Sequence, residues 1–361
     1  MSRMKGFVLV WAVLALVGLC IGGVPEAAAQ KAVKIKFAGV FPPPEVSAVS
    51  EIAKKWQEEV TQRTKGAITF ENYWGASLGS PAEHIELLKT GVVQAIQTHE
   101  WYTPTKMPFA DFEWVFPFGP TDHALVYKAK RELRSEFPQF AKELAGQNAI
   151  LMMGVAAGEY YFASKTPLRN LDDFKGTKVA LIGRYFGRWL PPGTTAVVRP
   201  MHERYELLKS GVAGADLSAY DNFYAFKLYE VTQYLTKNLP VMTGVGMPVL
   251  MNLATFNKFS PEVQKILVDT GKDLELGGAR DITAKWRDKI FKTFQASGMK
   301  FVEDFPAKDR EKWIAALEDI PAEWAAEMEK MGLPGFALVK RWQEITTGLG
   351  YKWPRQWGIK K

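Results

Sequence analysis

A ten-residue segment that occurs twice limits the folds open to this chain more than any other feature. Positions 83–92 read EHIELLKTGV and positions 203–212 read ERYELLKSGV, so each residue of the second copy lies 120 positions after its counterpart (203 − 83). Apolar residues at helical spacing predict an amphipathic helix in each copy, and the glycine can adopt the positive φ that ends a helix. An apolar strand is expected to follow at once.

A helix and one strand cannot bury their apolar faces alone. Each copy is therefore expected to lie in its own sheet of parallel strands covered by helices. The chain of 361 residues is long enough for two such domains. The repeat thus predicts two α/β lobes, and proteins of this class usually hold a ligand in the crevice between the lobes.

The first thirty residues differ in kind from the rest. Arg3 and Lys5 precede an apolar run over 7–20, and three alanines at 27–29 end the segment. This order of charged, apolar and small residues predicts a signal peptide over 1–29 that is cleaved near Ala29. An uncleaved membrane anchor is the alternative, because the apolar run approaches the length of a membrane span.

Cys20 is the only cysteine of the chain and lies inside this leader. A lipid-modified cysteine is a further alternative, although Leu19 is larger than the residue usually found before such a cysteine. Cleavage would leave a mature protein without cysteine, which excludes disulfides, thiol catalysis and cysteine metal sites.

The net charge of +7 comes from Lys and Arg scattered among Asp and Glu. This distribution indicates a solvated basic surface and no nucleic-acid partner. The four histidines lack the paired spacing of a metal site, and the chain has no phosphate loop or dinucleotide glycine pattern. We therefore expect no cofactor and no metal, and we expect a monomer.

Periodicity and breaker residues predict the remaining elements. The first lobe is expected to contain strands at 33–40, 68–74 and 92–97, helices at 46–62, from Pro81 and at 123–144, and a strand at 149–155 that leads with 160–164 into the second lobe. The second lobe is expected to contain a helical turn at 171–174 and strands at 178–182 and 196–199, followed by the second repeat over 201–218. The segments 227–235 and 242–253 are β-rich and are expected to lead back to the first lobe.

A long helix is expected to begin at Pro261, with Ser260 as its N-cap. A helix of about 35 residues is roughly 50 Å long, which would let it brace both lobes. Gly271, Gly277 and Gly278 favour a bend in it. Short helices around three later tryptophans are expected to pack as a cover.

Taken together, several stretches resemble the solute-binding proteins of tripartite ATP-independent periplasmic (TRAP) transporters along nearly the whole mature chain. They are Gly75 to Gly79, Leu87 to Val92, Phe116 to Phe118, Leu171 to Val179, Gly211 to Val212, Phe226 to Val231 with Tyr234 and Leu235, and Phe256 to Leu267. No single stretch is specific to this family, but the order and spacing of all of them together are.

The resemblance implies an α/β, two-lobed periplasmic binding protein fold with a long lobe-spanning helix. Lobe 1 would cover 31–155 with a return segment at about 245–300, lobe 2 would cover 156–244, and a helical cover would follow over 301–361. Such a periplasmic protein closes on a small organic acid, such as a dicarboxylate, and hands it to the TRAP membrane permease subunits. A sensor subunit that presents its ligand to a receptor has the same sequence features.

The chain departs from this family in the pocket. The resemblance places an arginine that binds the ligand carboxylate at the position of Ala180, and a second arginine at Glu159 or Tyr160. It places an asparagine at Ser218 and a large apolar residue at Met201. Because alanine cannot donate a hydrogen bond or neutralise a charge, the usual carboxylate clamp is absent.

Three accounts of the ligand charge remain open. Arg184 or Arg188 supplies the missing cation, or the carboxylate is held by backbone donors or the loop over 41–46, or the ligand is neutral or cationic with Glu159 or Glu100 as counter-charge. Aromatic residues near strand ends would then stack on a ring or surround a cation. They are Trp74, Trp101, Tyr102, Tyr160, Tyr161, Tyr185, Phe186, Trp189, Tyr220 and Phe223, of which about four are expected to touch ligand, because aromatic clusters usually form core.

The residues expected to bind ligand are therefore Trp74, Glu100, Trp101, Glu159, Tyr160, Ala180, Arg184, Tyr185, Met201, Ser218 and Tyr220. A remote alternative is a serine esterase, because Gly75 to Gly79 also spell the G-x-S-x-G nucleophile elbow around Ser77, with His123 and His202 available. The predicted N-cap of the next helix, Ser80, which forms a capping box with Glu83, lies three residues too late for an elbow. We expect no enzyme.

Overall fold

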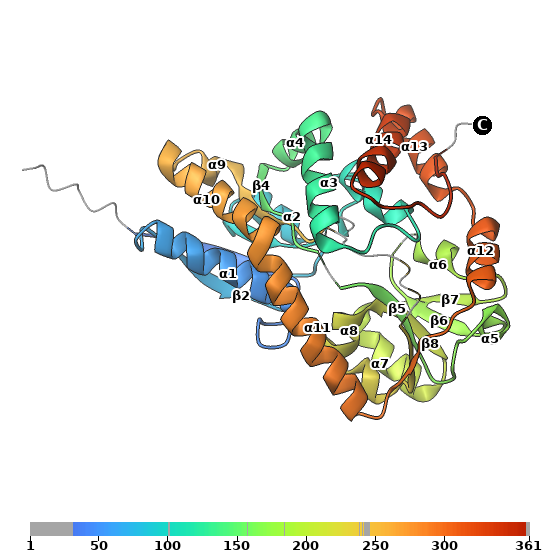
Figure 1. Ribbon diagram of the computed structural model, residues 1–361. Helices are drawn as coiled ribbons and strands as arrows, with labels where there is room; N and C mark the ends of the chain where they lie inside the picture. Colours follow the sequence, from blue (N-terminus) through green and yellow to red (C-terminus); the bar gives the residue numbers. More distant parts are fainter. Residues whose placement is uncertain are drawn as a thin grey trace, which may run out of the picture.

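The computed structural model describes residues 32–358 except 100, 101, 157, 184, 238, 240 and 242–245, so the predicted leader lies outside it. Two sheets form the two bodies seen in Figure 1. The five-stranded sheet has the order β2 (Ile68–Tyr73), β1 (Val33–Gly39), β3 (Ala95–Gln97), β10 (Val249–Asn252) and β4 (Ala149–Met153). The six-stranded sheet has the order β11 (Lys300–Val302), β9 (Tyr234–Thr236), β5 (Tyr160–Ser164), β8 (Ala215–Ala219), β6 (Lys178–Leu181) and β7 (Thr195–Val198).

The two copies of the repeat lie in different sheets, as predicted. The first forms α2 (His84–Lys89) and leads to β3, and the second forms α7 (Met201–Ser210) and leads to β8. The glycines that end the two helices have φ of +78° at Gly91 and +82° at Gly211. The predicted role of these glycines is therefore confirmed.

Neither sheet is purely parallel, which corrects the sequence-based expectation. β1 is parallel to β2 and β3, and β6 is parallel to β7 and β8. However, β10 runs antiparallel to β3 and β4, and β5 runs antiparallel to β8 and β9. These antiparallel strands, β5 and β10, are the first strands that the chain forms after it crosses from one sheet to the other.

Helix α1 (Ala48–Arg63) covers the first sheet with the predicted apolar face. Ser47 caps it, and Val49, Ile52, Ala53, Trp56 and Val60 are all buried. The Trp56 indole N–H donates to the carbonyl of Leu267, 3.1 Å away, which joins α1 to the long helix. This contact holds together two segments more than 200 residues apart.

The predicted long helix is present as α10 (Pro261–Asp273), a π-helical turn η4 (Leu274–Gly278) and α11 (Ala279–Ala296). It runs past α1 to α8 (Tyr220–Ala225), so it contacts elements of both bodies (Figure 1). Gly277 and Gly278 lie in the π turn. Gly271 serves a different purpose, because a Cβ there would lie 2.1 Å from the carbonyl oxygen of Met152.

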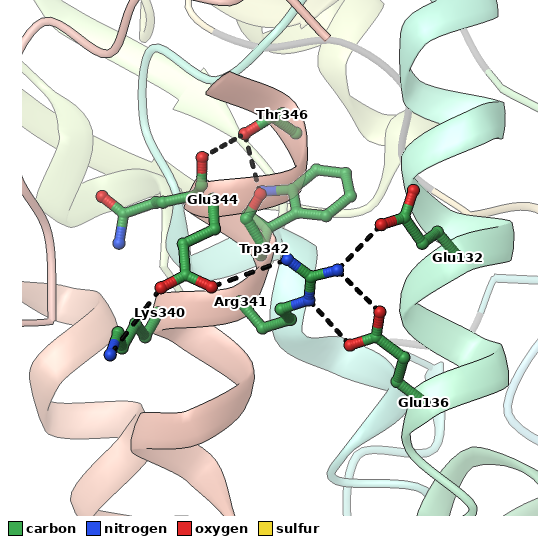
Figure 2. Close-up of polar contacts among 8 residues, drawn as sticks. Glu132, Glu136, Lys340, Arg341, Trp342, Glu344 and Thr346 are labelled. Atoms are coloured by element: carbon green, nitrogen blue, oxygen red, sulfur yellow. Dashed lines mark hydrogen bonds and ion pairs between the residues drawn. The ribbon is translucent and has the colours of Figure 1, made fainter. Parts of the chain in front are cut away.

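The tail forms the helices α12 (Ala307–Ala316), α13 (Ile320–Lys330) and α14 (Gly335–Gly348), whose tryptophans 313, 324 and 342 are buried. α14 packs on α3 (His123–Glu136). There, the Arg341 guanidinium donates to both Glu136 oxygens at 2.7 Å and to Glu132 at 2.8 Å (Figure 2). The tail therefore covers the first body, while α12 packs on α5 (Leu171–Phe174) of the second.

Other predicted elements have different limits. The helix expected at 123–144 is two helices, α3 and α4 (Gln139–Gly146), because Pro138 interrupts it. The helix expected from Pro81 begins at His84, although Glu83 does accept the Ser80 amide at 2.7 Å, half of a capping box.

The β-rich interpretation of 227–235 and 242–253 was correct only in part: each segment overlaps one short strand, and the second strand, β10, does return the chain to the first sheet. In the described part of these segments, a 3-10 turn η3 (Leu228–Glu230) and a short helix α9 (Leu253–Phe256) flank β9 and β10. Strand β11 was not predicted. No helix of the described residues is long and apolar enough to cross a bilayer. The lobe boundaries 31–155, 156–244 and 301–361 stay a prediction.

Candidate functional site

Aromatic rings from the two bodies meet at one place, which we call the seam: His99, Tyr102, Trp114, Tyr160 and Phe186. Trp114, in the 3-10 helix η2 (Ala110–Val115), lies 4.8 Å from the Phe186 ring and 6.1 Å from the Tyr160 ring, measured between centroids. Phe186 opens the short helix α6 (Phe186–Trp189) of the second body.

His99 follows β3 and lies 5.6 Å from the rings of Trp114 and Tyr102. Burial lowers the pKa of His99 to about 3, so the imidazole is neutral at pH 7. Burial also raises the pKa of Tyr102 to about 12. The first body therefore contributes only uncharged rings to the seam among these residues.

The second body contributes a buried ion pair. Arg204, in the first half of α7, and Asp216, on β8, are both fully buried, and Arg204 Nη1 lies 3.2 and 3.3 Å from the two Asp216 oxygens. Arg204 Nε donates to the Arg199 carbonyl at 3.1 Å. Burial raises the pKa of Asp216 to about 6 although the guanidinium opposes this shift.

A second acid, Asp221, lies in the first turn of α8, directly after β8. It is 9% exposed, and burial raises the pKa of its carboxyl to about 6. Tyr220 beside it is buried, and a Cβ on Gly158 would lie 2.3 Å from its ring. Position 158 therefore requires glycine for the close approach of this ring.

The pKa values of two seam tyrosines respond to these buried charges. Burial raises the pKa of Tyr160, and among the charged groups Asp221 raises it most while Arg204 lowers it. Arg204 also acts on the pKa of Tyr102. The strand register agrees for Tyr160, because its partner on β8 is Ala219, two residues before Asp221.

The residues predicted to bind ligand fall into four groups. Tyr160, Ser218 and Tyr220 are buried and lie at or beside the seam: the Ser218 hydroxyl contacts Met201 Sδ at 3.7 Å and accepts from Asn222 Nδ2 at 3.1 Å. Tyr185 is buried directly before α6. Glu100, Trp101 and Arg184 lie outside the described residues.

The others are placed in ways that the sequence did not indicate. Trp74 packs on Phe37 of the first sheet, with ring centroids 5.1 Å apart. Ala180 is fully buried on β6 and is the register partner of Asp216. Glu159 forms an ion pair with Arg287 of α11 at 3.3 Å, so its charge already has a partner.

Arg188, one of the two arginines considered for the missing cation, is held elsewhere. Its guanidinium pairs with Glu318 and, at 2.7 Å, with Glu323 of the tail. Arg204 is a buried cation that sequence reasoning missed. The signal was in the repeat itself, since position 204 corresponds to His84 and position 216 to Ile96, so that a charged pair stands where the first copy has none.

The serine-esterase alternative has no structural support around Ser77. Ser77 is exposed, and the helix that follows begins only at His84. A nucleophile elbow needs a helix to begin directly after the serine.

Two sheets joined by crossing segments and a shared long helix define the class of two-lobed solute-binding proteins. The model of the family described as bacterial extracellular solute-binding protein, family 7, matches residues 40–327, and the chain belongs to that family. The resemblance seen in the sequence is confirmed, and family members are binding proteins and not enzymes.

Known relatives agree with this assignment. A solute-binding protein of Sulfitobacter sp. (strain NAS-14.1) is 23% identical over 310 residues, 84% of this chain and 90% of the relative. A marine metagenome TRAP solute-binding protein specific for aromatic acid ligands, solved with metahydroxyphenylacetate, superposes with a TM-score of 0.77 at 23% identity and covers 88% of this chain and 100% of its own. A Bordetella pertussis extracytoplasmic solute receptor binding pyroglutamic acid superposes with a TM-score of 0.71 at 20% identity. The superposition covers 86% of this chain and 100% of that receptor.

Proposed function

We propose that this protein captures a small organic acid with a ring at the seam between its lobes and delivers it to the membrane permease of a TRAP transporter. One observation carries the proposal: rings from both bodies meet, with Trp114 4.8 Å from Phe186, and the buried Arg204 guanidinium lowers the pKa of the seam tyrosines Tyr102 and Tyr160, which burial raises. Flat apolar walls suit a ring, and a guanidinium suits a carboxylate. The family and the aromatic-acid ligands of a structural neighbour support it.

Closure of the lobes is the proposed mechanism. A ligand that contacts both Trp114 of the first lobe and Tyr160 of the second binds the closed state more tightly than the open one. It therefore shifts the equilibrium towards closure. The predicted signal peptide would place the mature chain outside the cytoplasm, in keeping with the extracellular family. A neutral or cationic ligand is less favoured, because Glu159 is already paired with Arg287.

A thermal-unfolding screen tests the proposal. Benzoate, phenylacetate, succinate and tetramethylammonium are each added to the mature chain, and an aromatic acid is expected to raise Tm most. A ligand at one hundred times its Kd stabilises the native state by about 2.7 kcal/mol. Absence of any shift with the acids, or a shift with tetramethylammonium alone, would contradict the proposal.

Two variants locate the binding at the seam. Trp114→Ala is expected to weaken binding of the aromatic acid at least tenfold by calorimetry. Tyr229→Ala removes a ring that packs on Phe294, 5.6 Å away in the second body, and serves as the matched control. Equal losses in both variants would count against the seam.

A further inference from the structure

Two buried side chains beside the seam each keep one polar atom without a hydrogen-bond partner among the described residues. They are Arg204, through Nη2, and Asp221, through Oδ1. Arg204 is fully buried and Asp221 is 9% exposed. A buried polar atom left unpaired is destabilising, and more so in a charged group, so native proteins rarely keep two at one place without use.

The other nitrogens of the Arg204 guanidinium, Nε and Nη1, donate to protein atoms. Nε donates to the Arg199 carbonyl and Nη1 to Asp216, which leaves the two N–H groups of Nη2 for another acceptor. A guanidinium is a planar, permanently charged fork whose geometry suits carboxylates. Asp216 thus holds the fork in place, and Nη2 can donate to an anionic oxygen.

Asp221 requires a hydrogen-bond donor on the ligand, whereas Arg204 requires an acceptor. An ionised carboxylate can only accept hydrogen bonds, so a ligand atom that pairs with Oδ1 must carry a hydrogen, as a hydroxyl or an N–H group does. The burial that raises the pKa of Asp221 to about 6 shows how little solvent stabilises its charge. A second carboxylate at this position would be repelled.

The two atoms belong to one site. Ala219, two residues before Asp221, is the register partner of Tyr160, and Asp216, which holds Arg204, lies on the same strand β8. In keeping with this placement, Asp221 raises and Arg204 lowers the pKa of Tyr160. Tyr160 also lies 6.1 Å from Trp114 and 5.3 Å from Phe186, between ring centroids, so the same tyrosine borders the aromatic walls.

We infer that the ligand is a ring acid that also carries a hydrogen-donating hydroxyl or N–H group, recognised at one end by Arg204 Nη2 and at the other by Asp221 Oδ1. This inference rests on the proposed function, because it assigns the two ends of a ligand at the same seam. The hydrogen-bonding groups are complementary: a neutral donor on the ligand pairs with Asp221 Oδ1, while the acid accepts from Nη2 of the guanidinium that Asp216 holds. A purely cationic ligand would leave Nη2 unpaired.

Calorimetric titration with two matched series tests the inference. The first series is 3-hydroxybenzoate, benzoate, 3-methoxybenzoate and 3-hydroxybenzyl alcohol, and the second is pyroglutamate, cyclopentanecarboxylate and 2-pyrrolidinone. In at least one series, the compound with both groups is expected to bind at least tenfold more tightly than every compound that lacks one. An intact protein site that is built to pair with a donor rejects an analogue without it.

Variants assign the two ends to residues. Asp221→Leu is expected to reduce the preference for the donor to less than twofold while the affinity for benzoate or cyclopentanecarboxylate stays within threefold. The double variant Arg204→Met with Asp216→Leu removes the ion pair without leaving one charge buried, and it is expected to weaken acids at least a hundredfold. Arg199→Met and Glu203→Gln, exposed side chains near the start of α7, are the controls. Circular dichroism confirms the fold of each variant.

The outcomes separate this inference from the proposed function. If ring acids bind but the donor brings no advantage, or the advantage survives in Asp221→Leu, the inference is wrong and the proposed function stands. Acid binding that is unchanged in the double variant would likewise remove Arg204 from recognition. If no compound of either series binds, the proposed function falls together with the inference.

Discussion

The first copy of the repeat, over 83–92, and the second, over 203–212, build the same helix ending with the same hydrogen bonds. Thr90 Oγ1 donates to the Glu86 carbonyl at 2.8 Å, and Ser210 Oγ donates to the Glu206 carbonyl at 2.7 Å. The amide two residues after each glycine donates to the carbonyl of the first leucine of the pair, at 3.3 and 3.1 Å. The backbone of the motif is therefore set by its shared residues.

The buried polar groups of the two copies differ. Position 84 is a histidine whose pKa burial lowers, and it corresponds to Arg204. Ile96 corresponds to Asp216, and all four side chains are fully buried. One lobe thus has a neutral interior at these positions and the other an ion pair. The comparison shows that the same helix–strand unit can keep its backbone structure while two buried positions differ. In the second copy these positions hold the charged pair that we propose takes part in recognition.

The largest expected effect comes from breaking the pair in the second copy. Asp216→Leu leaves the Arg204 charge buried without compensation, and this is expected to lower the free energy of unfolding by about 3–5 kcal/mol. Urea unfolding measures it. Adding Arg204→Met to this variant is expected to restore most of the stability, because an apolar pair replaces the ions. A double variant as unstable as the single one would show that the pair stabilises the lobe in its own right.

The two copies are expected to respond to pH with opposite sign. The pKa of Asp216 rises from 3.8 in the unfolded chain to about 6 in the native protein, so the native state binds more protons between these values. Its contribution therefore destabilises the fold progressively as pH rises from 4 to 6, by about 3 kcal/mol at most. The pKa of His84 is lowered from 6.5, so its contribution stabilises the fold as pH rises towards 6.5.

Unfolding free energies at pH 4, 5, 6 and 7 separate these terms. Relative to the double variant Arg204→Met with Asp216→Leu, the natural chain is expected to lose stability between pH 4 and 6. Relative to His84→Gln, it is expected to gain stability up to pH 6.5. Parallel curves for the natural chain and either variant would remove that residue from the pH response.

The smallest effect is expected where the copies are alike. Gly91→Ala and Gly211→Ala place a Cβ at φ of +78° and +82°, with no atom within 4 Å at Gly91 and only Lys165 Nζ, at 3.8 Å, at Gly211. The cost is therefore conformational, about 1 kcal/mol in each case. Chemical unfolding is expected to give losses that agree within about 0.5 kcal/mol. Unequal losses would show that the two helix endings differ in more than sequence.

Much of the fold followed from local pattern. The apolar face of α1, the two glycine stops and the long helix were predicted because each depends on residues close in sequence. The break at Pro138 was visible in the sequence but was not used. Strand β11 is three residues long and pairs with β9 across more than 60 positions, so no local periodicity marks it.

The candidate site was harder to predict. Tyr160, Ser218 and Tyr220 lie at or beside the seam, but the arginine expected at a strand position is absent there, and Arg188 is engaged by tail acids that lie 130 and 135 positions away. The bond between Arg204 and Asp216 joins a helix to a strand, and each residue alone looks like an ordinary surface charge. Only their joint burial marks them.

The sequence by itself determined that two similar α/β units exist, where their helices end and which family they belong to, because helix ends and apolar faces depend on near neighbours. The tertiary structure decided which charges are buried, since burial depends on what packs over a side chain from distant segments. For this reason Arg204 and Asp221, and not the residues expected from resemblance alone, define the proposed recognition of the ligand.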